Sequence, residues 1–215
     1  MRLTHFGHSC LLMETTVQGG ATRVLFDPGT YSRDFEDLRN LNLVLITHGH
    51  PDHLDADRVR ALAERNPEAA IVHSPGAAAA LDGLSATAAR PGDKLTVDGV
   101  DITVTGSGKH ATIHPDLTGA DNNGYLVDGV LLHPGDALDA PEAEVDVLLV
   151  PVGAPWLKIR ESIDYVRTVR PGVVVPIHQA GLAEVHQRMH YALLRDLAPS
   201  GTEVVVLDHA TPYTV

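Results

Sequence analysis

Several short runs of apolar, largely β-branched residues constrain the fold of this chain more than any other feature. Each run is long enough for one strand and too short for a typical helix. Several are apolar at every position, which is typical of strands buried on both faces of a sheet. The predicted strands are Arg23–Phe26, Leu43–Ile46, Asp101–Gly106, Val130–His133, Val145–Val150, Val173–Ile177 and Glu203–Leu207.

Helical patterns lie between these strands. The periodicity is strongest in Asp55–Arg65 and in Leu182–Leu197, where apolar residues recur on one helix face. Weaker patterns occupy Pro75–Leu81 and Glu161–Val169. Strands that alternate with covering helices predict an α/β protein.

Composition and length limit the class of protein. With 215 residues and 44% hydrophobic content, the chain can bury a core as one domain spanning residues 1–215, and no low-complexity linker divides it. The single cysteine, Cys10, excludes an internal disulfide and fits a reducing compartment. No stretch approaches the ~20 apolar residues of a membrane span, so we expect a cytoplasmic protein without a membrane partner.

The net charge restricts the partners of the protein. A formal charge of −12 repels polyanions, and no run of Lys or Arg offsets it locally. We therefore expect a small-molecule substrate rather than a nucleic acid. The sequence leaves homo-oligomerisation open.

A dense polar cluster follows the apolar run Leu43–Ile46. In "ITHGHPDHLDADR", three histidines and an aspartate fall within six residues. Gly49 and Pro51 interrupt regular structure, and the predicted helix begins a few residues later. The cluster therefore lies on a strand-to-helix loop, at the carboxyl end of a strand, where α/β folds place their chemistry.

The spacing within this cluster favours metal binding. His48 and His50 are two residues apart and can point to the same side, whereas Asp52 and His53 follow the kink and point elsewhere. Four ligands that cannot all converge on one ion indicate two adjacent ions. The alternative is a polar helix N-terminus with solvated histidines, but H-x-H-x-D-H after a buried strand favours metal. Imidazoles suit zinc, and carboxylates can join manganese or iron.

Further candidate ligands lie at the ends of other β-rich runs. His110 follows "DITVTGSGK", Asp136 lies in "VLLHPGDAL", and His178 ends "VVVPIH". Each comes at or just beyond the end of its run, so all three could gather at one edge of the sheets.

Together these motifs resemble the metallo-β-lactamase-fold hydrolase superfamily over nearly the whole chain. "FDPG" resembles its first motif, "THGHPDH" its second, His110 its third, "HPGD" its fourth and "PIH" its fifth. The order "HFGHSCLLMET", then "LFDP", then the cluster resembles the branch that contains ascorbate-6-phosphate lactonase and related uncharacterised hydrolases. The resemblance implies a four-layer αβ/βα sandwich, in which two sheets pack face to face under outer helices.

The resemblance also implies two divalent metal ions, with zinc expected first and manganese or iron as alternatives. The implied ligands of the first ion are His48, His50 and His110. Those of the second are Asp52, His53 and His178, and Asp136 bridges both ions with a water or hydroxide. Asp27 would orient a ligand from outside the metal shell.

Four other residues are candidates for the substrate pocket or for supporting the ligands. His114 lies four residues after His110 and is open to a pocket, supporting or surface role. His8, in "FGHSC", is placed near the cleft by the resemblance. Trp156 and Lys158, in "APWLK", could form a recognition loop with an aromatic wall and a cation for an anionic group; simple packing and solvation remain the alternative.

The function that follows is metal-dependent hydrolysis. A hydroxide held between two cations would attack an ester, lactone, phosphoester or amide bond of a small molecule, and Asp52 or Asp136 would assist proton transfer. The alternatives are a nuclease of the same fold, a di-iron oxidoreductase and a non-catalytic metal-binding protein. The net charge disfavours the nuclease. The oxidoreductase would be expected to replace the second histidine with glutamate, and this chain keeps His50.

Overall fold

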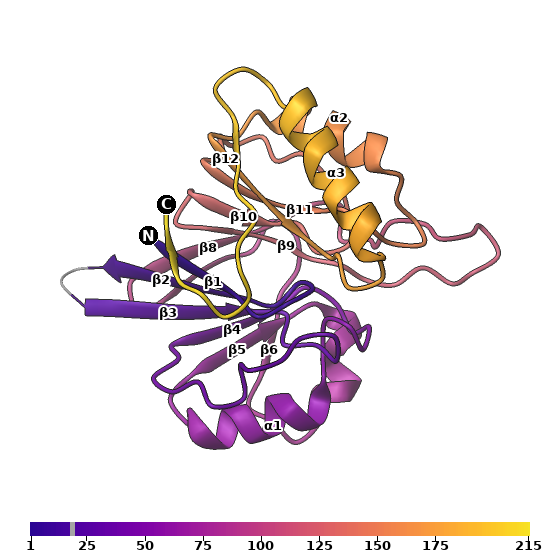
Figure 1. Ribbon diagram of the computed structural model, residues 1–215. Helices are drawn as coiled ribbons and strands as arrows, with labels where there is room; N and C mark the ends of the chain where they lie inside the picture. The colour runs from indigo at the N-terminus through magenta and orange to yellow at the C-terminus, as the bar shows by residue number, and fades with distance from the viewer. Residues whose placement is uncertain (18–19) are drawn as a thin grey trace.

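The structure is a computed structural model that describes residues 1–17 and 20–215 (Figure 1). Its described strands form two seven-stranded sheets. The first sheet has the order β14-β1-β2-β3-β4-β5-β6, with β1 (Arg2–His5), β2 (Leu11–Val17), β3 (Gly20–Phe26), β4 (Leu43–Ile46), β5 (Ala70–His73), β6 (Thr87–Ala88) and β14 (Tyr213–Thr214). The second has the order β13-β12-β11-β10-β9-β8-β7, with β7 (Lys94–Val97), β8 (Val100–Thr105), β9 (Gly124–Val127), β10 (Leu131–His133), β11 (Val147–Pro151), β12 (Val173–Ile177) and β13 (Glu203–Val204).

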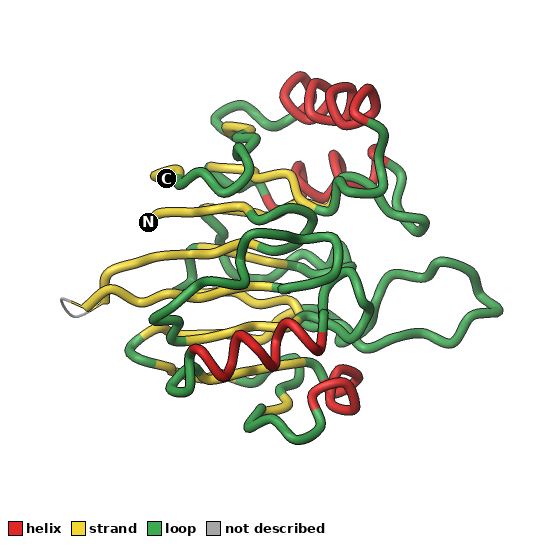
Figure 2. The backbone as a smooth tube through the Cα atoms, turned by 60° about the horizontal axis from the view of Figure 1, so that its bottom comes forward, coloured by secondary structure: helices red, strands yellow, loops and turns green. Residues whose placement is uncertain are grey.

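Helices cover the outer faces of both sheets. The helix α1 (Ala56–Arg65) lies on the first sheet, with the 3-10 helix η1 (Pro75–Leu81) beside it, and α2 (Ile159–Val169) and α3 (Glu184–Leu197) lie on the second (Figures 1 and 2). The result is the αβ/βα sandwich that the sequence predicts. None of the described helices combines the length and apolar character needed to cross a membrane.

Apolar stripes attach these helices to the sheets. Val59 and Leu62 of α1 are buried in one cluster with residues of the first sheet, including Val44. Ile163 and Val166 of α2 are buried in a second cluster with residues of β11 and β12. The start of α1 is fixed by Asp55, whose side chain accepts a hydrogen bond from the backbone N–H of Arg58.

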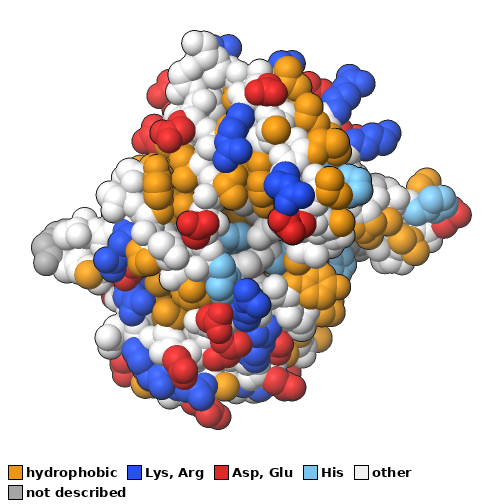
Figure 3. Space-filling model, in the orientation of Figure 1, with side chains coloured by type: hydrophobic (Ala, Val, Ile, Leu, Met, Phe, Trp, Pro, Cys, Tyr) orange, Lys and Arg blue, Asp and Glu red, His pale blue; other side chains and the backbone are white. Residues whose placement is uncertain are grey.

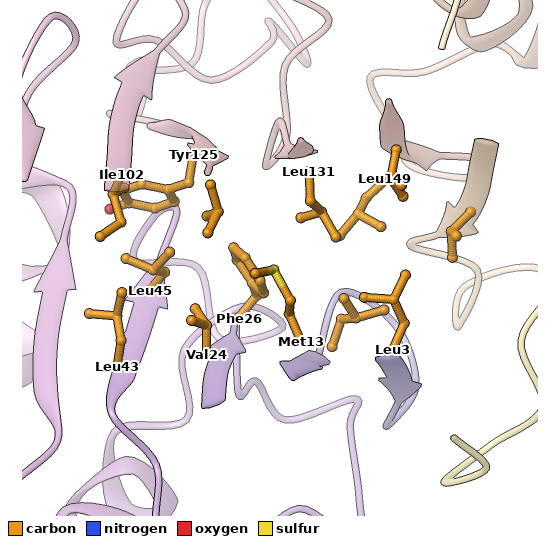
Figure 4. Close-up of a cluster of buried hydrophobic side chains, with 14 of the residues drawn as sticks. Leu3, Met13, Val24, Phe26, Leu43, Leu45, Ile102, Tyr125, Leu131 and Leu149 are labelled. Carbon is orange, nitrogen blue, oxygen red and sulfur yellow. The ribbon is translucent and has the colours of Figure 1, made fainter. Parts of the chain in front are cut away.

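The main core lies between the two sheets. Figure 4 shows Phe26 and Leu45 of the first sheet facing side chains of the second, among them Tyr125 and Leu131. Burying each large apolar side chain contributes about 1.5–3 kcal/mol. The hydroxyl of the fully buried Tyr125 donates to the carbonyl of Ile46 (3.0 Å), which satisfies its polar atom and connects the second sheet to the end of β4.

The strand directions bring several loops to one edge of the sandwich. The pairs β3–β4 and β4–β5 are parallel in the first sheet, and β10–β11 and β11–β12 are parallel in the second. Parallel strands place their carboxyl ends at the same edge of a sheet. The polar residues that follow β3, β4, β10 and β12 are therefore neighbours in space.

Candidate metal centre

The loop after β4, which carries the histidine and aspartate cluster, packs against the loop after β3. Asp27, directly after β3, accepts hydrogen bonds from the backbone N–H of Thr47 at Oδ1 (2.8 Å) and from its hydroxyl at Oδ2 (2.7 Å). A Cβ atom at Gly29 would lie 1.9 Å from the carbonyl oxygen of Asp52, so only glycine allows this approach. "FDPG" therefore fixes the backbone that carries the cluster.

One group of candidate ligands joins His48, His50 and His110. Their imidazole nitrogens lie within 4.8 Å of one another. Nε2 of His48 is 3.1 Å from Nδ1 of His50, and the two rings are nearly perpendicular. His48 is fully buried and the side chain of His110 is only 5% exposed, whereas His50 is half-buried, so the group opens toward solvent at His50.

A second group joins Asp52, His53 and His178, together with His8. Oδ2 of Asp52 is 3.5 Å from Nε2 of His178 and 3.1 Å from Nε2 of His8. The structure thus brings together each of the two sets of three residues that the sequence assigns to one ion.

Asp136 lies between the two groups. Its Oδ1 is 3.1 Å from Nε2 of His53 and 3.2 Å from Nε2 of His178, and its Oδ2 is 3.2 Å from Nε2 of His110. Burial opposes ionisation, but the neighbouring imidazoles of His53, His110 and His178 hold the pKa of Asp136 well below its usual range. A carboxylate in this position can reach an ion in either group.

The hydrogen-bond partners assign the tautomers of four of the histidines. In each ring Nδ1–H donates to an oxygen, which leaves the lone pair of Nε2 pointing into the centre. The acceptors are Oγ1 of Thr47 for His48 (3.0 Å), Oδ2 of Asp27 for His53 (2.6 Å), the carbonyl of Ala111 for His110 (2.5 Å) and the carbonyl of Gly153 for His178 (2.7 Å). Imidazoles that bind metal ions are usually held in this way.

Three buried atoms at the centre make no hydrogen bond to any residue that the structure describes. They are Nε2 of His53, Nε2 of His178 and Oδ1 of Asp136, which lie close together without hydrogen-bond geometry. Leaving a buried polar atom unpaired costs about 1–3 kcal/mol. Imidazole lone pairs and carboxylate oxygens are ligand atoms for a divalent cation, so the donor set fits a metal.

A family profile described as the beta-lactamase superfamily domain matches residues 2–178. The chain belongs to the metallo-β-lactamase-fold hydrolase superfamily. The predictions of superfamily and fold are thereby confirmed, and the chain is a member of a superfamily of metal-dependent hydrolases.

Individual relatives of this superfamily cover the chain almost completely. Protein Rv0786c of Mycobacterium tuberculosis is 44% identical over 218 residues, covering 99% of this chain and 100% of its own. A UPF0173 metal-dependent hydrolase of Methanosphaerula palustris is 30% identical over 198 residues, which is 83% of each chain. A crystal structure described as a metal-dependent hydrolase from Parabacteroides distasonis has a TM-score of 0.75 and 22% identity, covering 96% of this chain and 92% of that one.

His8 differs from the other histidines of this metallo-β-lactamase-fold centre. The backbone N–H of Ala180 points to its Nδ1 at 3.4 Å, so its proton belongs on Nε2, which then donates to Asp52. Burial lowers the pKa of His8 to about 4, so the ring is neutral. Its φ of +52°, like that of Asp27 (+42°) and His178 (+62°), lies in the left-handed region, where backbone strain is often stored at functional sites.

The remaining predicted residues fall at different distances from the centre. Trp156 is in contact with it, since its indole N–H donates to Oδ2 of Asp136 (2.9 Å). His114 is 61% exposed on the loop between β8 and β9, where it lines a cavity beside His110 but joins neither ligand group. Lys158 is exposed, and its backbone N–H donates to Glu161 at the start of α2.

Two residues that the sequence analysis did not single out support the centre. Thr47 hydrogen-bonds to both Asp27 and His48. The sequence shows it merely as a hydroxyl residue directly before the cluster. Asn122 accepts a hydrogen bond from the backbone N–H of Asp136 (3.0 Å). No motif in its sequence context, "DNNG", predicts this contact. A Cβ at Gly135 would lie 2.1 Å from Oδ1 of Asn122, so the glycine of "HPGD" is needed for the contact.

Other histidines and the cysteine have structural environments. His133 is fully buried, stacks on Phe26 and hydrogen-bonds to the carbonyl of Ser9 (3.0 Å). In α3, Nδ1 of His190 donates a hydrogen bond to the carbonyl of Val152 (2.7 Å). His186 is exposed, so the two histidines lie in different environments. Burial raises the pKa of the Cys10 thiol well above its usual value, so this thiol is a poor nucleophile.

Replacing Asp27 tests how the ligands are held. Asp27→Asn keeps the volume but removes one of the acceptors used by Thr47 and His53, so metal affinity should fall about 10–100-fold while the fold persists. Competitive chelation measures the affinity, and circular dichroism checks the fold. Asp208→Asn, at an exposed carboxylate, is the control. Equal affinities in both variants would show that Asp27 does not orient a ligand.

Proposed function

We propose that the protein is a binuclear hydrolase that binds two divalent cations, zinc first among them, and cleaves an ester, lactone, phosphoester or amide bond of a small molecule. The observation that carries this proposal is the tautomer pattern. Four histidines, two from each ligand group, leave Nε2 free toward the centre because Nδ1 of each donates to an oxygen. Two carboxylates, Asp52 and Asp136, complete the two sets.

The proposed assignments follow the groups. His48, His50 and His110 hold one ion, Asp52, His53 and His178 hold the other, and Asp136 reaches both. His8 holds Asp52 through its Nε2–H and is not itself a ligand.

Each part of the centre then has a chemical task. Divalent cations held by the two ligand groups would supply Lewis-acid chemistry, lowering the pKa of bound water and polarising the bond to be cleaved. Asp52, half-buried at the edge of the centre, accepts the proton of the attacking water and returns it to the leaving group. Trp156 donates its N–H to Oδ2 of Asp136 and so fixes the plane of that carboxylate.

Two cavities beside the centre support catalysis over simple metal storage. A cavity of about 500 Å³ borders Asp52 and His178, and one of about 460 Å³ borders His50 and His110. Both volumes fall in the range of small-molecule sites. A substrate bound across the centre would have room on either side of the bond to be cleaved.

A nuclease receives no support from the surface in view. On the face shown in Figure 3, Lys and Arg side chains are interspersed with Asp and Glu rather than gathered into one basic area. Together with the net charge of −12, this arrangement disfavours a polyanionic substrate.

A substrate screen tests the proposed function. The purified protein, loaded with zinc or manganese, is assayed against carboxylic esters, lactones, amides, phosphodiesters and structured RNA. We expect hydrolysis of a small-molecule class that stops on chelation and returns when metal is restored. Fully loaded protein that cleaves none of the small molecules, or cleaves only RNA, would contradict the proposal.

A further inference from the structure

The cavity beside Asp52 and His178 is walled by both halves of the sandwich. We call it the Leu182 cavity, after the residue at its outer wall. Its volume is about 500 Å³. Apart from residues of the centre, its walls include Thr30, Tyr31 and Pro51 from the loops of the first sheet and Ala154, Pro155 and Leu182 from the loops of the second. The cavity therefore adjoins the proposed reaction centre directly.

The walls of the Leu182 cavity are uncharged. Among the described residues that line it, only Asp52, His8 and His178 carry groups that are acidic or basic near neutral pH, and all three belong to the centre. Lys158, the cation expected on a recognition loop, is not part of the lining. An anionic group placed here would lose its hydration without gaining a partner, which is costly.

Two side chains give the cavity a defined apolar shape. Leu182 lies against Gly153, where an added Cβ would be 2.5 Å from its Cγ, and the carbonyl of Gly153 holds His178. Tyr31 is 60% exposed and packs edge-on to His8, with ring centroids 5.2 Å apart. An exposed aromatic ring at a cavity wall offers contact area to an apolar ligand.

The second cavity contains imidazoles but no other acidic or basic side chain in its described lining; His50 and His110 belong to the centre, and His114 is 61% exposed. This cavity lies under the loop between β8 and β9, which projects from the body of the molecule (Figures 1 and 2). Its described lining includes Ile113, Leu117 and Ala120, and no Lys, Arg, Asp or Glu. Among the described residues, neither cavity therefore provides a Lys or Arg side chain for a phosphate or carboxylate distant from the bond cleaved.

We propose that the Leu182 cavity binds an uncharged, apolar acyl group, so that the substrates are neutral carboxylic esters, lactones or amides rather than compounds with a remote phosphate or carboxylate. This inference rests on the proposed function and narrows its substrate class. The acyl carbon lies at the metal centre, and the chain attached to it extends along Pro51 and Leu182.

Binding of two matched acids tests the substrate class without turnover. Octanoate and octanedioate have the same chain length and differ by one terminal carboxylate. Isothermal titration calorimetry on the zinc-loaded protein should show octanoate binding at least about tenfold more tightly, because the second carboxylate would be desolvated without a partner. Equal binding, or tighter binding of octanedioate, would overturn the inference.

A pair of variants locates the acyl chain. Leu182→Lys supplies a cation to the cavity and should abolish or invert the preference for octanoate. Leu117→Lys makes the same change at the 58% exposed Leu117 in the other cavity and should leave the preference unchanged. Inversion in Leu117→Lys alone would overturn the assignment to the Leu182 cavity. A preference for octanoate without hydrolysis of any ester, lactone or amide would contradict the proposed function and the substrate class that rests on it, whereas hydrolysis together with equal binding of the two acids would contradict the substrate class alone.

Discussion

Replacing Asp136 by asparagine should nearly abolish turnover while the protein stays folded. Asp136 contacts His53 and His178 through one oxygen and His110 and Trp156 through the other. Asparagine keeps the volume but loses the negative charge, and its N–H₂ group cannot accept the hydrogen bond that the indole N–H of Trp156 donates. The loss should exceed the ~10–100-fold typical of residues that only orient a ligand.

The measurement is kcat on a verified substrate, together with metal content and circular dichroism. Asp139→Asn is a matched control, because Asp139 lies in the same loop and accepts a hydrogen bond from Ser107 (2.7 Å) away from the centre. The control should retain activity. A lower melting temperature is expected in Asp136→Asn, since bound metal stabilises the folded state. Unchanged kcat in Asp136→Asn would refute its role between the two ions.

The second large effect is a loss of bound metal that distinguishes His110 from His114. His110→Ala should release metal from the first group, whereas His114→Ala should leave metal occupancy intact and at most change substrate affinity. Nε2 of His110 lies 3.2 Å from Asp136, and its Nδ1 is held by the carbonyl of Ala111. The side chain of His114 is 61% exposed, and its Nδ1 accepts a hydrogen bond from the backbone N–H of Asp116 (3.2 Å).

Elemental analysis and competitive chelation of both variants decide between these histidines. A zinc–nitrogen bond of ~2.0–2.1 Å tolerates little displacement, so one histidine cannot simply replace the other. Metal loss in His114→Ala with full retention in His110→Ala would reverse the assignment.

Two buried strands were predictable with their bounds because apolar side chains occupy every position, whereas the equally buried β9 (Gly124–Val127) was not predicted. Leu43–Ile46 and Val173–Ile177 are strands with the predicted bounds. The predicted strand Glu203–Leu207 is shorter in the structure, where the strand that pairs with β12 is Glu203–Val204. A strand needs a paired neighbour as well as apolar residues, and the sequence does not show where that pairing ends. Strand β7 was not predicted, since Lys94–Val97 mixes exposed and half-buried residues at the sheet edge.

The proposed ligands were visible in the sequence because each occupies a motif at the end of a strand. Among the supporting residues, Asp27 was expected from the resemblance, and its carboxylate contacts His53. The other supporting contacts were not visible, since they arise only when distant loops meet. Asn122 reaches the backbone of Asp136, and Trp156 reaches its carboxylate, across sequence separations that no local pattern encodes. The tautomer of His8 depends likewise on Ala180, which is 172 residues away.

Metal stoichiometry tests the central claim most directly. The protein is saturated with zinc, freed of excess ion and analysed for metal per chain, with Asp52→Ala measured beside it. The account predicts about two ions per chain in the wild-type protein, and about one in Asp52→Ala because only the group of Asp52, His53 and His178 loses a ligand. No more than one ion in the saturated wild-type protein would contradict the binuclear centre.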